Sequence, residues 1–121
     1  MGKRVVIALG GNAIKQADEE GTAEEQMINV QIACRQIVEI ARRGYEIVIT
    51  HGNGPQVGNL AIQQEQAQHI VPPQPLVVLG AMTQGQIGYM MQQSLRNQLV
   101  KDDKPIATVV TQVIVDKNDP D

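Results

Sequence analysis

Two short apolar runs frame a longer segment in which apolar residues recur every three or four positions. The runs at 4–9 (Arg-Val-Val-Ile-Ala-Leu) and 45–50 (Tyr-Glu-Ile-Val-Ile-Thr) are rich in β-branched residues, which is typical of strands in a parallel sheet. The segment between them has helical periodicity. A strand, a helix and a second strand of these lengths predict a right-handed βαβ unit.

The helix between the two runs carries start and stop signals. Thr22-Ala23-Glu24-Glu25 fits a capping box, so the helix is predicted to begin near Ala23, and Gly44 is a suitable C-cap. A single apolar stripe then runs for about five turns. Its members are Met27, Val30, Cys34, Ile37 and Ala41. Cys34, the one cysteine, is interpreted as a packed thiol with no chemistry.

The rest of the chain predicts two more helices and a third strand. A helix over 55–68 has a glutamine-rich face, and the proline-rich stretch 71–75 is a rigid connector. A helix over 76–101 contains Gly80, Gly85 and Gly88, for which close packing of a helix is favoured over ligand contact. The apolar stretch 106–115 is interpreted as a third parallel strand, followed by a polar tail. At 121 residues the chain makes one α/β domain at most.

Glycine-rich loops follow both predicted strands of the βαβ unit. Gly10-Gly11-Asn12 ends the first strand, and Thr50-His51-Gly52-Asn53-Gly54-Pro55-Gln56-Val57-Gly58 ends the second. Because the carboxyl ends of parallel strands meet at one edge of a sheet, the two loops are expected to be neighbours. Bare backbone beside a helix start suits an anion, although each loop alone also fits a tight strand-to-helix turn.

The predicted site therefore consists of the backbone and Asn amides of the two loops, with a few further candidates. Lys15 is a candidate cation, with a plain surface lysine as the alternative. His51 is either a general base or a cap on the strand end, and Thr83 is a possible polar lining residue. Neither loop contains an acidic residue, and two histidines with one cysteine make no zinc set, so no metal ligand is predicted.

Charge and composition favour small-molecule ligands. The net charge is −3 and the basic residues are dispersed, which argues against a nucleic-acid or anionic membrane partner. No apolar run is long enough to span a bilayer and no signal-peptide core follows the first residues, so a cytoplasmic location is expected.

Established nucleotide motifs fit poorly. The sequence lacks both G-x-G-x-x-G and G-x-x-x-x-G-K-[ST], which makes a nicotinamide oxidoreductase and a P-loop NTPase weak alternatives. The two loops outline a phosphoryl-transfer site, because such catalysis consists mostly of positioning and of stabilising charge on phosphoryl oxygens. A metal-binding acid and a purine pocket have no candidates, so the sequence predicts one half of such a site.

Three ordered motifs resemble the amino acid kinase superfamily and, within it, the carbamate kinases. They are the two loops, with Ala8-Leu9 before the first and Ala13 after it, and Gly80-Ala81-Met82-Thr83-Gln84-Gly85-Gln86-Ile87-Gly88-Tyr89. Many superfamily members place a lysine where this chain has Ala8, and the carbamate kinases share that departure. The resemblance implies a three-layer αβα fold with a mainly parallel open sheet, of which residues 1–121 are the N-terminal portion without the nucleotide-binding lobe.

The same resemblance implies a reaction. Carbamoyl phosphate and ADP would give ATP and carbamate reversibly, with Mg²⁺, in a cytoplasmic homodimer that serves arginine or nitrogen catabolism. On the matching positions, Gly10, Gly11 and Asn12 would hold the phosphoryl group, and the run Gly52, Asn53 and Gly54 would hold the carbamate end. The 121-residue chain alone would hold no magnesium or nucleotide and would be inactive. The alternative is a non-catalytic, truncated domain that binds an anion or a partner subunit.

Overall fold

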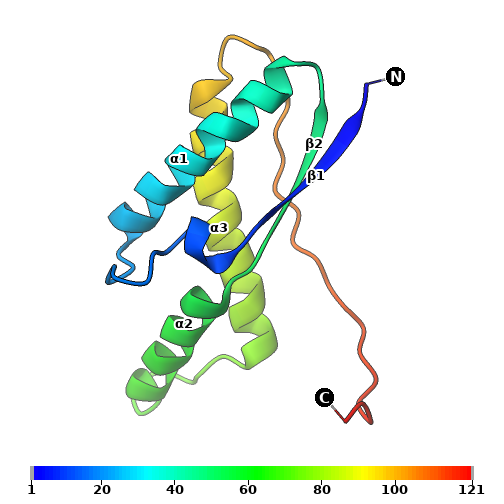
Figure 1. Cartoon of the computed structure of the whole chain (residues 1–121). Helices are drawn as coiled ribbons and strands as arrows, with labels where there is room; N and C mark the ends of the chain where they lie inside the picture. Colours follow the sequence, from blue (N-terminus) through cyan, green and yellow to red (C-terminus); the bar gives the residue numbers. More distant parts are fainter. Residues whose placement is uncertain (1, 121) are drawn as a thin grey trace.

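A computed structural model describes residues 2–120, except the side chain of Asn12. Its elements are β1 (Arg4–Leu9), the 3₁₀ helix η1 (Gly11–Ala13), α1 (Ala23–Arg42), β2 (Glu46–His51), α2 (Gly54–Ala67) and α3 (Leu76–Gln98) (Figure 1). Each predicted helix is present with boundaries within three residues of those expected from the sequence. The short helix η1 was not predicted.

β1 and β2 form a parallel two-stranded sheet. Their register pairs Arg4 with Glu46 and Leu9 with His51, and α1 connects them, so the predicted βαβ unit is confirmed. Alternate side chains are half-buried against the helices, while Val6 on the opposite face is 65% exposed. The α/β class and the parallel sheet are therefore as expected. Within residues 2–120, helices cover only one face of the sheet, which gives two of the three expected layers.

The capping box at the start of α1 is also confirmed. The Thr22 hydroxyl accepts a hydrogen bond from the Glu25 N–H at 3.2 Å, and the Glu25 carboxylate accepts from the Thr22 N–H at 2.9 Å and the Gly21 N–H at 2.7 Å. These backbone donors, Thr22 first, lower the pKa of Glu25. Gly44 ends the helix with a φ of +88°, a conformation that glycine adopts without strain.

The core lies between α1, α3 and the inner face of the sheet. Val30, Cys34 and Ile87 are almost completely buried there. Burial raises the pKa of the Cys34 thiol, which agrees with a packed side chain. Among the helices of residues 2–120, none has the length and apolar character needed to cross a membrane.

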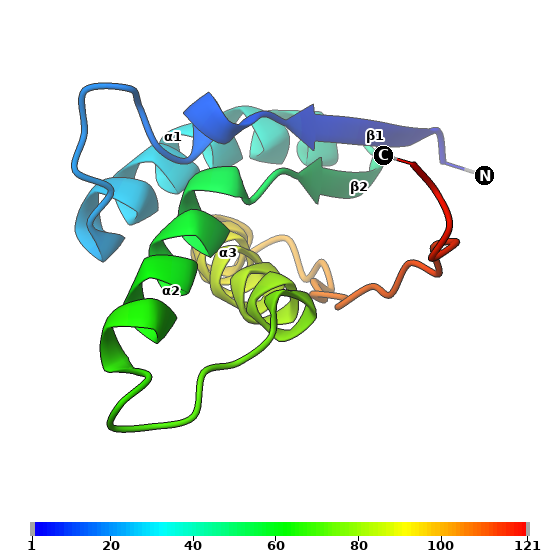
Figure 2. The ribbon, with the colours of Figure 1, turned by 90° about the horizontal axis from the view of Figure 1, so that it is seen from below.

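α2 is the least buried of the helices and packs against α3 (Figure 2). Most of its predicted glutamine face is exposed, although Gln64 accepts a hydrogen bond from the N–H of Gln74 at 2.9 Å. That bond attaches the proline-rich connector to the helix. Gln56 is the one residue of α2 that is fully buried.

The third strand predicted over 106–115 is wrong. This segment is extended but has no strand pairing (Figures 1 and 2). Residues of β2 and of this segment both line a hollow of about 700 Å³. Side-chain bonds hold the segment on α3 instead, because the Thr108 hydroxyl donates to the Gln92 side chain at 2.9 Å and the Thr111 N–H donates to the Gln84 side chain at 2.7 Å. β-Branched residues favour extended backbone, but contacts with α3 take the place of the predicted sheet ladder.

The glycines of α3 differ in their surroundings. A Cβ on Gly88 would overlap the methyl group of Thr108, whose hydroxyl also bonds the Gly88 carbonyl at 3.1 Å. A Cβ on Gly80 or Gly85 would meet nothing within 4 Å. Close packing thus accounts for Gly88, and its partner is the extended segment and not a helix as expected.

Replacing Gly88 with alanine is expected to displace the extended segment from α3. Overpacking costs about 1–3 kcal/mol, which outweighs the gain of about 1 kcal/mol from better helix propensity. Hydrogen exchange at the Thr111 amide should accelerate in this variant and stay slow in the control Gly85→Ala. Equal protection in the two variants would contradict the packing described here.

Candidate anion-binding site

The two glycine-rich loops are neighbours at one edge of the sheet. Leu9 and His51 are paired in the strand ladder, and the Gly52 N–H donates to the Leu9 carbonyl at 3.3 Å. Figure 2 shows η1 and the start of α2 side by side just beyond the strand ends. The adjacency predicted from the parallel topology is therefore present.

Both loops turn directly into helical structure and leave N–H groups free. Gly10 is extended, with φ −70° and ψ 168°, and η1 begins at the next residue. Asn53 precedes α2 with φ −145° and ψ 11°, makes no side-chain capping bond, and is followed by Gly54 and Pro55 in the first turn. Within residues 2–120, the N–H groups of Gly11, Asn53 and Gly54 have no hydrogen-bond partner. A helix start with free N–H groups and its positive dipole end attracts anions.

The loop glycines are not explained by the protein's own packing. A Cβ placed on Gly10, Gly11, Gly52 or Gly54 would meet no atom within 4 Å. None of these four has a positive φ, which occurs instead at Gly21 and Gly44. Neither crowding nor backbone conformation requires glycine here, so the open space over the loops is the feature that remains to be explained.

The side chain of Asn53 is hydrogen-bonded to α3. Its side-chain amide donates to the Thr83 hydroxyl at 2.8 Å, and that hydroxyl donates to the Gly80 carbonyl at 2.9 Å. Thr83 is completely buried, so it supports the loop and does not line an exposed surface. The Asn53 side chain is thus directed at α3, whereas its backbone N–H is free. The side chain of Asn12, the other predicted amide, lies outside the described part of the structure.

Lys15 closes the turn that follows η1. Its ammonium group donates to the carbonyls of Glu19 at 2.7 Å and Gln16 at 3.3 Å. Its alkyl chain passes so near Gly21 that a Cβ there would come within 2.8 Å of Cε. The Lys15 ammonium group therefore stabilises the 15–21 turn. The side chain would have to leave these carbonyls before it could contact a ligand at the loops.

His51 lies at the end of β2 and bonds the backbone there, which agrees with its interpretation as a cap on the strand end. Its Nδ1 lies 3.0 Å from the Gly52 carbonyl, which can only accept, so an Nδ1–H tautomer donates there. Its ring also borders the hollow beside β2.

Two buried glutamines near the loops were not predicted from the sequence. Gln26 and Gln56 are 5% and 4% exposed, and the Gln56 side-chain amide donates to Gln26 Oε1 at 2.9 Å. A signal existed for Gln26, because it lies four residues before Val30 on the apolar stripe of α1. A polar residue on a buried stripe needs a partner, and that partner comes from the second glycine-rich loop.

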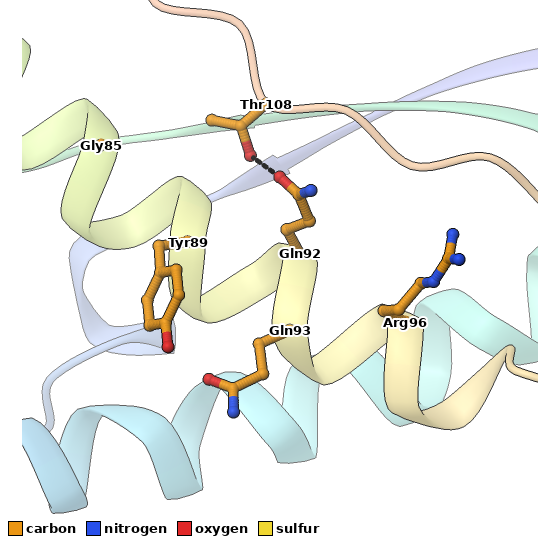
Figure 3. Close-up of a pocket in the computed structure, with 6 residues that line it drawn as sticks. All are labelled: Gly85, Tyr89, Gln92, Gln93, Arg96 and Thr108. Atoms are coloured by element: carbon orange, nitrogen blue, oxygen red, sulfur yellow. Dashed lines mark hydrogen bonds between the residues drawn. The ribbon is translucent and has the colours of Figure 1, made fainter.

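Gly11, Asn53 and Gly54 do not line either of two hollows in the described structure. One is the space beside β2, and the other, of about 430 Å³, runs along α3 past Gly85, Tyr89 and Arg96 (Figure 3). In Figure 3, Gln92 is directed at Thr108 and Arg96 supplies the single charge. Within residues 2–120, no group of three His, Cys, Asp or Glu residues is placed to hold a metal ion.

The fold is that of an α/β protein with two glycine-rich loops at one edge of its sheet, and comparison with known families specifies the class. The model of the amino acid kinase family matches residues 3–115, and the chain belongs to this family. Within the family it is similar to the carbamate kinases, as the motifs indicated.

The similarity to carbamate kinases covers almost the whole chain. The enzyme of Pyrococcus furiosus is 59% identical over 99% of this chain, and that of Thermococcus kodakarensis is 60% identical over 98%. A structure of Giardia lamblia carbamate kinase bound to AMP-PNP superimposes with a TM-score of 0.81 at 50% identity, over 86% of this chain and 33% of the other. The chain spans about 40% of the length of the curated relatives that it matches.

Proposed function

We propose that this chain forms the carbamoyl phosphate side of a carbamate kinase, which transfers a phosphoryl group reversibly between carbamoyl phosphate and ADP. The observation that carries the proposal is the open space over four glycines that the chain itself does not require. The motif resemblance and the similarity to carbamate kinases support the choice of ligand.

The proposed roles of the two loops come from their resemblance to the carbamate kinase motifs. Gly10, Gly11 and Asn12 hold the phosphoryl group, whose oxygens accept from backbone N–H groups. Gly52, Asn53 and Gly54 hold the carbamate end at the start of α2. Fixed N–H donors stabilise charge that develops during transfer, because they need no reorganisation at the moment of reaction. Since a ligand carbonyl or phosphoryl oxygen must come close to the backbone, a side chain at Gly54 would obstruct it.

The rest of the proposed reaction lies with other parts of the enzyme. Magnesium with ATP or ADP is proposed for the longer protein, as a cytoplasmic homodimer, in which residues 1–121 are the N-terminal part and a separate lobe binds the nucleotide. Within the described part of the chain, no three His, Cys, Asp or Glu side chains lie together to hold a metal ion, and no step is assigned to one here. Lys15 remains a candidate contact only if it leaves the Glu19 carbonyl.

One observation favours the alternative of a non-catalytic domain that binds a partner subunit. The sheet face away from the helices exposes Val6 and Val48, and β2 has an open edge. Such surfaces promote association. Light scattering combined with calorimetric titration separates the two proposals, because assembly without carbamoyl phosphate binding favours the alternative.

The purified 121-residue chain is expected to make no ATP from carbamoyl phosphate and ADP, yet to bind carbamoyl phosphate. A luciferase assay measures ATP with high sensitivity, and isothermal calorimetry measures the binding. ATP formation above the no-protein control would contradict the assignment of only one half of the site to this chain.

A further inference from the structure

A pair of buried glutamines connects the second loop to the start of α1. Gln26 is the fourth residue of α1, and Gln56 is the third residue of α2. Their side chains are almost fully buried and share the 2.9 Å hydrogen bond described above. The first turn of α2 is therefore bonded directly to the first turn of α1.

The connection continues from α1 to the segment that follows the first loop. Gln26 Nε2 donates to the Gly21 carbonyl at 2.6 Å. One turn further along α1, the Asn29 side chain donates to the Ile14 carbonyl at 3.2 Å and to the Glu19 carboxylate at 2.7 Å. Two buried amides thus attach the 14–21 segment to α1 at three points, and the Gln26–Gln56 bond attaches the second loop to the same helix.

Stability alone does not explain the pair. Burying two amides removes them from water, and a hydrogen bond between them recovers little more than that loss. Methionine has nearly the same volume and would fill the space without any polar group to satisfy. The hydrogen bond differs from an apolar methionine contact because it requires a defined distance and angle. It therefore forms only when the starts of α1 and α2 keep one separation and one relative orientation.

We propose that Gln26 and Gln56 are positioning residues that fix the free N–H groups of one loop relative to those of the other. They act through the backbone and do not touch the ligand. This role rests on the proposed function, because a ligand that spans both loops is what makes their relative placement matter. Within that function, the pair determines affinity for a two-ended anion such as carbamoyl phosphate more than affinity for inorganic phosphate.

The test compares Gln56→Met, Gln26→Met and the double variant with the control Gln63→Met, which changes an exposed glutamine on the same helix. Each single variant is expected to weaken carbamoyl phosphate binding about tenfold. The double variant should lose no more affinity than Gln26→Met, because both lack the bond between the two glutamines and the bond from Gln26 to the Gly21 carbonyl. The midpoint of urea unfolding should stay near the wild-type value in the double variant, whereas each single variant leaves one buried amide without its partner and should unfold at lower urea. Wild-type affinity in the single variants, or losses that add in the double variant, would overturn the proposal.

A second measurement needs no ligand and separates this proposal from the proposed function. In ¹⁵N NMR spectra, Gln56→Met should shift the amide resonances of residues 10–13, which belong to the other loop, whereas Gln63→Met should not. If the wild-type chain binds no carbamoyl phosphate, the proposed function fails while these shifts still report the coupling. Unchanged resonances at residues 10–13 would overturn the positioning role whatever the binding result.

Discussion

Replacing Gly54 with alanine is expected to weaken carbamoyl phosphate binding by about tenfold while leaving the fold as stable or more so. The added methyl group meets no atom of the protein, so it enters only the space assigned to the ligand. Overpacking a well-fitted contact costs about 1–3 kcal/mol, and about 1.4 kcal/mol corresponds to a factor of ten in affinity. Reduced freedom of the unfolded chain should raise stability by about 0.4–1 kcal/mol. Calorimetric titration and urea unfolding measure the two effects separately.

Gly58→Ala is the matched control for this prediction. Gly58 lies one turn further along α2, and a Cβ there also meets nothing within 4 Å. The control should gain stability in the same way and keep wild-type affinity. If both variants bind equally well, the open space at Gly54 is not the ligand's space and the proposed site is wrong.

Replacing Ile87 with alanine is expected to lower the free energy of unfolding by about 2–5 kcal/mol, the range for truncating a large aliphatic side chain in a core. Ile87 is completely buried in the cluster between α1 and α3, so the cavity has little room to collapse. Urea unfolding followed by circular dichroism measures the change.

Val77→Ala provides the comparison for Ile87, because Val77 is 81% exposed on the same helix. Exposed truncations usually change stability by no more than about 0.5 kcal/mol. Similar losses in the two variants would mean that α3 does not pack on α1 as described.

The stability of the protein at acid pH should depend on Glu25, whose pKa is lowered in the folded state. Its contribution to stability is present above the ordinary titration range of a glutamate and is lost as the pH falls through the folded-state pKa.

The parts of the fold that local patterns determine were predictable from the sequence. The capping box at Thr22, the apolar stripe of α1 and the β-branched runs before each loop all act over a few residues. Adjacency of the loops followed from these elements, because parallel strands joined by a helix leave few alternatives.

Features that depend on contacts between distant residues were not predictable in the same way. Thr108 and Thr111 lie on α3 because of contacts with residues 16 to 27 positions earlier in the chain, and nothing within 106–115 indicates this. Those residues are Gly88, Gln92 and Gln84. The orientation of Asn53 toward Thr83 likewise depends on how α3 packs. Sequence reasoning could therefore place the loops but not the direction of their side chains.

Free N–H groups of both loops are proposed to bind one ligand, and an NMR titration tests this binding most directly. Carbamoyl phosphate added to the ¹⁵N-labelled chain is expected to move the amide resonances of Gly11, Asn53 and Gly54 together, with one saturation curve. Resonances from the hollow along α3, such as those of Tyr89 and Arg96, should stay in place. Movement confined to α3, or no saturable movement at either loop, would contradict the account.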